Sequence, residues 1–434
     1  MMPEGTLSPV DDRVGLIRWV FDIPIEPGEP RIFNASVKMA DTTRYNPRPC
    51  YDNNGGSGLT REQARNAAIG EGLERYCCSV FDPADLVLGS AAELSSAYEL
   101  CRPSQFALFH PEQPGRYPRT DEETKLAWTW GWSLPRKRAA LVPSCLVYMP
   151  YFPCFPDRGE EVAGPAVSTG LACARSVEEA ALKGIYESVE RDAFMIAWSN
   201  RLPVPRVDHQ SQPDLARLYR ERLRRDGLRY VLLRITTDIP IPSFLCLLID
   251  ERRTPPMICA GAAADLDPIR AAGKAMTEAV QTREWAKFLG GGGRKFQFAP
   301  DFSDIRDFED HVALYAYGDM LHAVQFLMSE SNECISGCWD NGSVRDAKRD
   351  LERTVEILAA RDLEIIALDL TSPDVAECGY HVARVMIPEL QPLDADHLHR
   401  FMGGRRLYEV PQRMGYAEGP TNIESLNIYP HPFP

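Results

Sequence analysis

The chain has 434 residues, 44% of them apolar and 25% charged, with a formal net charge of −14. This composition predicts a globular protein of one large or two ordinary domains. The negative balance argues against nonspecific binding to nucleic acid or anionic membranes, so a bound polyphosphate would need local cations. No signal-peptide core is present at the start, and no apolar run approaches the ~20 residues that span a bilayer. We therefore expect a cytoplasmic protein.

The first 58 residues predict part of a sheet and the approach to a helix. Residues 1–30 are rich in proline, and within them the apolar run 14–23 is expected to form an edge strand. Residues 33–42 predict a strand, and Asn53–Gly58 a turn-rich loop. Such a loop before a capped helix could admit a phosphate, since helix N-termini favour anions. A simple flexible connection is an equally good interpretation.

The first of two acidic helices is expected over residues 60–79. Thr60 and Gln63 have the spacing of a capping box, and the helix carries Glu71-x-x-Glu74-Arg75. After it, residues 80–165 alternate short apolar runs with proline and glycine, which predicts strands.

The second acidic helix begins with another capping box, Ser176-x-x-Glu179, and is expected to end near Trp198. It carries Glu187-x-x-Glu190-Arg191-Asp192. Its apolar positions occupy one side, so the carboxylates occupy another. Taken alone, this motif is typical of a solvated helix face with an intrahelical Glu187–Arg191 ion pair.

Two helices with the same Glu-x-x-Glu-Arg spacing favour a different interpretation. Four carboxylates gathered at one site are tolerated only if cations neutralise them. Mg²⁺ fits, because it binds one or two carboxylates per ion and completes its shell with water and phosphate oxygens. Four glutamates, two arginines and two Mg²⁺ ions leave a positive charge that attracts ATP. The pattern predicts a nucleotide site without a conventional phosphate loop.

The middle of the chain predicts an antiparallel or mixed sheet with helices packed on it. A basic helix is expected near residues 213–225, followed by strands at 230–237, 243–250 and 257–264. Asp267 then caps a third notable helix that has Pro268 at its first position. It carries Glu278-x-x-Gln281-x-Arg283. Glu278 and Gln281 share a face, whereas Arg283 points toward the other side unless the helix ends or bends there.

In the last third, helices are expected near 310–328 and 344–360, and strands at 363–370 and 381–388. The glycine run 290–293 predicts a mobile surface loop, with a lid over substrate as the alternative. The closing residues 430–434 alternate proline with other residues, which stiffens them. A disordered tail is the ordinary interpretation, but this rigidity favours a docked one.

The cysteines are expected to be buried small hydrophobes, since a reducing compartment disfavours disulfides. The chain has twelve, and Cys334-x-x-x-Cys338 is the main tempting pair besides Cys77-Cys78. Because no histidines flank it at zinc-finger spacing, we predict no structural zinc there.

Together these motifs resemble the YcaO family, and within it the azoline-forming cyclodehydratases, the D proteins that modify ribosomally made precursor peptides. The resemblance runs from residue 34 to 434. It rests on the ordered set Ala67-x-x-x-Glu71-x-x-Glu74-Arg75, Glu179 through Asp192, and Glu278-x-x-Gln281-x-Arg283, with residues 382–393 and the closing Pro-x-Pro-x-Pro. It implies an α+β fold of YcaO type, with mixed or antiparallel sheets and helices around an ATP site. We expect a YcaO domain over 33–434, including the tail 430–434, after an N-terminal extension, 1–32.

The resemblance also implies roles for individual residues. Metal ligands are expected at Glu71, Glu74, Glu187 and Glu190, and nucleotide contacts at Arg75, Glu179, Arg191, Glu278, Gln281 and Arg283. The C-terminal carboxylate of Pro434 is expected in the active site as an acid or base, positioned by the stiff tail. The chain departs from the family pattern at Ala67 (usually Ser), at Ser57 in Gly-Ser-Gly (usually Gly-Lys-Gly) and at Thr169 (usually Asn), which bears on nucleotide binding.

The implied reaction is an ATP-dependent cyclodehydration. A Cys, Ser or Thr side chain of the peptide attacks the preceding carbonyl, and ATP phosphorylates the resulting oxyanion. Loss of phosphate then leaves a thiazoline or oxazoline. Phosphorylation makes the amide oxygen a good leaving group, while Mg²⁺ and arginine offset the developing charge.

We expect a separate leader-binding partner, E1-like or ocin-ThiF-like, because about thirty weakly patterned residues are too few for a leader-binding domain. A dehydrogenase partner and a homodimer are left open. The alternatives are a YcaO enzyme that forms a thioamide or amidine, against which the proline-rich end weighs, and a noncatalytic YcaO scaffold subunit of a synthetase complex.

Overall fold

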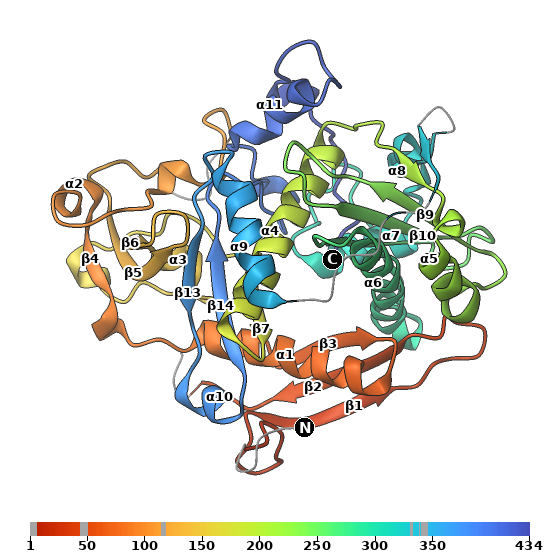
Figure 1. Ribbon diagram of the computed structural model, residues 1–434, viewed down its shortest axis with the longest axis horizontal. Coiled ribbons are helices and arrows are strands. Elements are labelled where there is room, and N and C mark those ends of the chain that lie inside the picture. The colour runs from red at the N-terminus through yellow and green to blue at the C-terminus, as the bar shows by residue number, and fades with distance from the viewer. Residues whose placement is uncertain (1–6, 44–50, 114–118, 330–332, 338, 340–345) are drawn as a thin grey trace.

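Three sheets, each covered by a long helix, surround the middle of the molecule in the computed structural model (Figure 1). The structure describes residues 7–43, 51–113, 119–329, 333–337, 339 and 346–434. The strands pair antiparallel, except for the short parallel pair of β8 with β12. The predicted α+β class is therefore confirmed.

The first sheet has the order β1-β2-β3 and lies under helix α1. Its strands are β1 (Ile17–Ile23), β2 (Phe33–Met39) and β3 (Asn53–Gly58), and α1 covers Arg61–Ser79. Strand β1 is at the edge of the sheet, as predicted. Part of the segment 1–32 therefore belongs to this sheet. Thr60 and Gln63 form the predicted capping box.

The prediction of a loop at Asn53–Gly58 is wrong, because all six residues form strand β3, paired with β2. The glycines allow α1 to pack directly on this strand. A Cβ at Gly56 would lie 2.2 Å from the backbone nitrogen of Ala68. The glycine run thus marks close backbone packing rather than a turn.

The second sheet has the order β11-β10-β9-β8-β12 and is covered by α6 (Pro268–Leu289). The predicted cap of α6 is present, since Asp267 accepts hydrogen bonds from the backbone N–H groups of Ile269 and Arg270. The strands are β8 (Arg206–Val207), β9 (Leu228–Arg234), β10 (Ser243–Asp250), β11 (Ile258–Ala264) and β12 (Cys334–Ile335).

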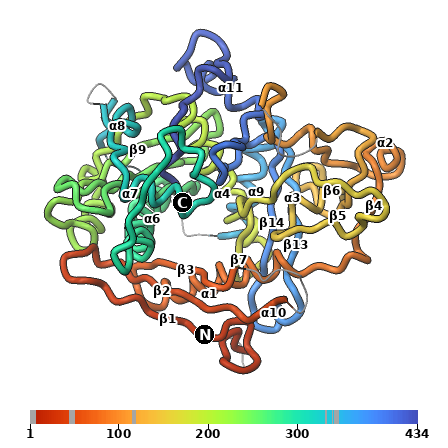
Figure 2. The backbone as a smooth tube through the Cα atoms, turned by 180° about the vertical axis from the view of Figure 1, so that it is seen from behind, coloured from red at the N-terminus to blue at the C-terminus, as the bar shows by residue number. Residues whose placement is uncertain are grey.

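The third sheet has the order β4-β5-β13-β14-β7, with β6 also paired to β5. Helix α4 (Val177–Ser199) packs on β14 and β7, and α9 (Ala347–Ala359) packs on α4. The strands are β4 (Val87–Ser90), β5 (Lys125–Ser133), β6 (Arg138–Pro143), β7 (Leu171–Ala174), β13 (Ile366–Asp369) and β14 (His381–Met386). Figure 2 shows this sheet from behind.

Two of the expected helices differ in detail from the structure, and the start of a third cannot be compared with it. The helix expected near 310–328 is divided into α7 (Phe308–Tyr317) and α8 (Leu321–Val324), because α7 ends at Gly318. The predicted basic helix is present as α5 (Pro213–Leu218), which continues as a π-helix over Tyr219–Leu223. The start expected at residue 344 lies outside the described residues. The remaining short helices are α2 (Ala91–Leu94), α3 (Ser144–Val147), α10 (Pro373–Glu377) and α11 (Arg405–Arg413).

The proline-rich end is docked, as predicted. Phe433 is 2% exposed and belongs to the apolar cluster between α4 and the second sheet. The Tyr315 hydroxyl donates to the Pro430 carbonyl oxygen at 2.6 Å, and Trp198 Nε1 donates to the Tyr429 carbonyl oxygen at 3.2 Å. The His431 ring stacks on His311 with ring centroids 4.0 Å apart.

The ten cysteines in the described residues are free, and most are buried, as predicted. Cys334 is exposed, and Cys338 lies outside the described residues. In the part of the chain that the structure describes, no helix is long and apolar enough to cross a bilayer.

Candidate functional site

The acidic motifs of α1 and α4 meet at the strand that begins after Gly170. Glu74 on α1 accepts a hydrogen bond from the backbone N–H of Cys173 at 2.8 Å. Glu187 on α4 accepts one from the backbone N–H of Gly170 at 3.2 Å. Glutamates about a hundred residues apart in sequence are therefore held by one four-residue stretch of backbone.

These carboxylates are close enough to influence one another's pKa values. Burial raises the pKa of Glu74 to about 8, and the negative charges of Glu71 and Glu187 contribute to this rise. Burial also raises the pKa of Glu71, again with a contribution from Glu187. On α4, burial raises the pKa of Glu190 to about 8, with the charges of Glu278 and Glu187 acting in the same direction. Without added cations the ionised forms are disfavoured, as expected for a site built to receive positive charge.

The arginines of the two motifs lie among these carboxylates. Arg75 Nη2 is 3.5 Å from Glu71 Oε1, and Arg191 Nη2 is 3.6 Å from Glu187 Oε1. Arg191 also forms an ion pair with Glu190. The intrahelical pairs expected of a solvated face are thus present, but Arg75 and Arg191 are only 18% and 16% exposed. The motifs therefore do not form an ordinary solvated face.

Strand β3 and helix α6 form another side of the site. The backbone N–H of Gly55 donates to Glu71 Oε2 at 3.0 Å. The Ser57 hydroxyl donates to Gln281 Oε1 at 2.8 Å. Glu278, one turn before Gln281 on α6, influences Glu190 through its charge. Strand β3, helix α6 and residues 170–173 therefore border the same group of carboxylates.

Two predicted nucleotide residues have other partners. Arg283 points away from the Glu278 face, as the spacing predicted, and its Nε donates to Glu29 Oε2 at 2.9 Å. Its Nη1 donates to the Pro256 carbonyl oxygen at 2.7 Å. Ser176 accepts the N–H of Glu179, but the Glu179 carboxylate pairs with Lys183 at 3.2 Å rather than completing the predicted capping box.

The C-terminal residues reach the same site. The guanidinium carbon of Arg191 lies 4.2 Å from the centroid of the Phe433 ring, a cation–π contact. Phe433 also packs against the Phe194 ring, with centroids 5.1 Å apart. The tail is thus held against the turn of α4 that carries Glu190 and Arg191, with Pro434 adjacent.

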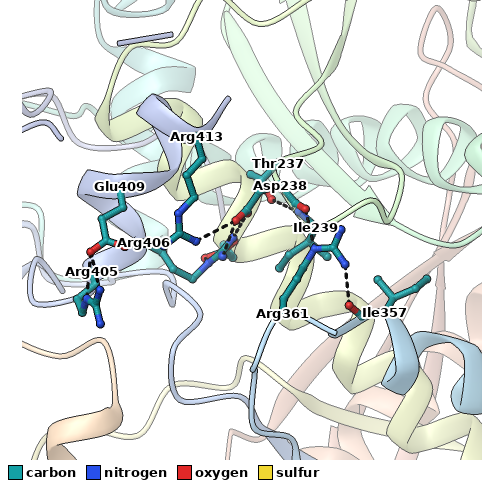
Figure 3. Close-up of polar contacts among 10 residues, drawn as sticks. Thr237, Asp238, Ile239, Ile357, Arg361, Arg405, Arg406, Glu409 and Arg413 are labelled. Carbon is teal, nitrogen blue, oxygen red and sulfur yellow. Dashed lines mark hydrogen bonds and ion pairs between the residues drawn. The ribbon is translucent and has the colours of Figure 1, made fainter. Parts of the chain in front are cut away.

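Asp192 anchors this part of α4 to the C-terminal region. Its carboxylate is fully buried and receives two hydrogen bonds from Arg406 on α11, at 2.7 and 2.9 Å. It also accepts the backbone N–H of Gln391 at 3.0 Å. Arg406 and Arg413 in turn both bind Asp238, as Figure 3 shows. Asp192 is therefore a structural member of the motif rather than a ligand.

The side chains at the site have the chemistry to bind Mg²⁺ and a polyphosphate. Within the described residues, no group of three or more His, Cys, Asp or Glu side chains is arranged to hold a metal ion. Mg²⁺ does not need one, since one or two carboxylates with phosphate oxygens and water suffice. Arg75 Nη1 is buried and has no hydrogen-bond partner among the described residues. Because an orphaned guanidinium N–H beside carboxylates with raised pKa values would be satisfied by a phosphate oxygen, the residues fit the group.

Sequence patterns alone did not identify some members of the site. The backbone N–H groups of Gly170 and Cys173 carry no side-chain signal. Lys274 forms an ion pair with Glu278 at 3.2 Å. Its spacing of four residues before Glu278, on the predicted face of α6, could have revealed it.

Comparison with known proteins shows to which family the chain is related. A family model described as YcaO cyclodehydratase, ATP- and Mg²⁺-binding, matches residues 55–391. An uncharacterised protein in the tfuA 3′ region of Rhizobium leguminosarum bv. trifolii is 31% identical over 245 residues, which are 52% of this chain and 54% of that protein.

The fold is shared with several solved structures. A heterocyclase in complex with substrate and cofactor superposes with a TM-score of 0.79 at 23% identity, over 98% of this chain and 56% of that one. YcaO from Methanopyrus kandleri, bound with AMPPCP and Mg²⁺, gives a TM-score of 0.59 at 19% identity, over 88% of both chains. The chain thus spans about half the length of the Rhizobium protein and of the heterocyclase.

Proposed function

Because the chain belongs to the YcaO family, we propose that it is an ATP-dependent cyclodehydratase that converts Cys, Ser or Thr of a ribosomally made peptide to thiazoline or oxazoline. The observation that carries the proposal is the meeting of the α1 and α4 carboxylates on the backbone of residues 170–173. Divalent cations would stabilise the ionised forms of these carboxylates, whose pKa values are raised. An anion beside them would accept a hydrogen bond from the unpaired N–H of Arg75.

In this proposal Glu71, Glu74, Glu187 and Glu190 hold Mg²⁺. When bound, Mg·ATP supplies the phosphoryl group that turns the amide oxygen into a leaving group. Arg75 and Arg191 would contact the phosphates, and carboxylates of their own helices hold both side chains in position. The other proposed nucleotide contacts are Glu179, Glu278, Gln281 and Arg283. For Arg283, direct contact with a phosphate requires its ion pair with Glu29 to open.

Pro434 is proposed as the group that moves a proton, through its terminal carboxylate. The Phe433–Arg191 contact supports this, since it fixes the tail beside Glu190. We also propose that a separate E1-like or ocin-ThiF-like protein brings in the leader of the precursor peptide. The solved E. coli microcin synthetase McbBCD complex, to which the fold is similar at a TM-score of 0.58, offers a precedent for an assembly.

Reconstitution tests the proposal. The full chain, Mg·ATP, the candidate partner and the precursor peptide are incubated, and phosphate release and peptide mass are followed together. We expect the peptide to lose one water per ring, in step with ATP consumption. Glu187→Gln should abolish both, whereas Glu178→Gln in the first turn of α4 should change neither. Exchange of oxygen for sulfur in the peptide would instead identify thioamide formation, and no turnover with any partner would favour the scaffold role.

A further inference from the structure

Lys274 lies on the face of α6 that borders the carboxylates. It precedes Glu278 by one turn and Gln281 by two, so the three side chains share one face of the helix. That face is turned toward the site, since Gln281 accepts the hydrogen bond from Ser57 on β3. Lys274 Nζ is 3.2 Å from Glu278 Oε1.

The charges of the second acidic helix, α4, also act on the ammonium of Lys274. The charge of Glu278 raises the pKa of Lys274, and the charges of Glu190 and Glu187 add to this rise. Glu187 and Glu190 belong to α4, not α6. Because Gln281 on the same face of α6 bonds to Ser57, Lys274 lies on the side of α6 that borders these carboxylates. In Figure 1 the C-terminus is marked between these two helices.

Lys274 differs from the other basic groups near the site in how freely it can move. Arg75 and Arg191 are largely covered, and each is held by a carboxylate of its own helix. Lys183 is held by both Glu179 and the Cys173 carbonyl oxygen. Lys274 is 62% exposed, and the one ion pair described for it is with Glu278. An exposed pair of this spacing is weak, so an incoming anion can take its place.

We propose that Lys274 is a phosphate-binding residue, which leaves Glu278 and contacts the polyphosphate when Mg·ATP occupies the site. This inference rests on the proposed function. The alternative is an ordinary surface ion pair that only supports α6. Ser57, which faces the same side of α6 from β3, is uncharged, so Lys274 supplies an ammonium that β3 does not.

Nucleotide affinity without turnover tests this role. Binding of AMPPCP with Mg²⁺, and of AMP, is measured by calorimetry on the full chain and on Lys274→Met, which keeps the length of the side chain but not its charge. We expect AMPPCP to bind at least ~10-fold more weakly to the variant, with AMP affinity nearly unchanged, because only the longer phosphate chain reaches the ammonium. Lys274→Arg should retain most of the affinity. Lys348→Met, an exposed lysine on α9, is the control and should bind as the parent chain does.

A second variant relocates the charge. Adding Ser57→Lys to Lys274→Met should recover AMPPCP affinity, because the new ammonium enters from β3 on the same side of the site. Equal AMPPCP affinity of Lys274→Met and the parent would overturn the role of Lys274 while leaving the proposed function intact. Equal weakening of AMPPCP and AMP would mean that Lys274 only supports the helix, and also overturns the inference. If the parent chain itself binds no Mg·AMPPCP, both proposals fail.

Discussion

Replacing Glu74 by glutamine should stabilise the metal-free protein at high pH. Glutamine keeps the oxygen that accepts the Cys173 N–H but cannot carry the charge that burial and the neighbouring Glu71 and Glu187 disfavour. A carboxyl whose pKa rises on folding binds protons more tightly in the folded state. In the parent chain, ionisation of Glu74 therefore lowers the stability as the pH rises from about 4.5 toward about 8. Glu74→Gln has no charge to gain at this position, so it does not lose this stability.

The size of the effect follows from the pKa. The rise from 4.5 to about 8 corresponds to about 5 kcal/mol of unfolding free energy for complete ionisation. Glu74 is only partly buried, and solvent screens its interactions, so we expect roughly 2 kcal/mol. The expected result is equal stability of parent and variant near pH 4.5 and a variant more stable by this amount near pH 9.

Urea unfolding of the metal-free proteins at both pH values, followed by circular dichroism, measures this difference. Glu62→Gln, an exposed change in the first turn of the same helix, is the matched control and should behave as the parent does. Adding Mg·AMPPCP should stabilise the parent and the control but not Glu74→Gln. A Glu74→Gln variant no more stable than the parent at pH 9 would refute the claim that burial and the neighbouring carboxylates disfavour the charge of Glu74.

Two further predictions concern the structure behind the site. Asp192→Asn removes the charge that receives two hydrogen bonds from buried Arg406, and should lower the free energy of unfolding by about 3 kcal/mol in urea titrations. Phe433→Ala removes a ring that is 2% exposed and covers Arg191, and should cost about 3 kcal/mol of stability. It should also reduce peptide cyclisation more than AMPPCP affinity, because the ring positions the tail and not the phosphates.

Each of these has its own control. Asp238→Asn alters a more exposed partner of Arg406 and should lower the free energy of unfolding clearly less than Asp192→Asn does. Equal decreases would mean that the buried Asp192–Arg406 pair stabilises the fold no more than the more exposed one. Phe433→Leu keeps an apolar side chain in the cluster and should recover most of the stability. If Phe433→Ala reduces nucleotide affinity and cyclisation equally, the tail has a structural role only.

The local elements of the site could be predicted from the sequence. Capping residues such as Thr60 and Asp267 fix where helices begin, and the three- and four-residue spacings fix which carboxylates share a face. The off-face direction of Arg283 followed from the same geometry, and its ion pair with Glu29 confirms it. Glycines were misleading at Asn53–Gly58, because a glycine run is equally compatible with a turn and with a strand that a helix closely covers.

By itself, the sequence determined that two helices each present a Glu-x-x-Glu-Arg face and that the proline-rich end is stiff, since these depend on neighbours in the chain. Only the tertiary structure decided that Glu74 and Glu187 share the backbone of residues 170–173, that Gln281 on α6 meets Ser57 on β3, and that Phe433 covers Arg191. Such contacts join residues far apart in the chain, and local spacing cannot specify them. They are set by how the three sheets pack around the middle of the molecule.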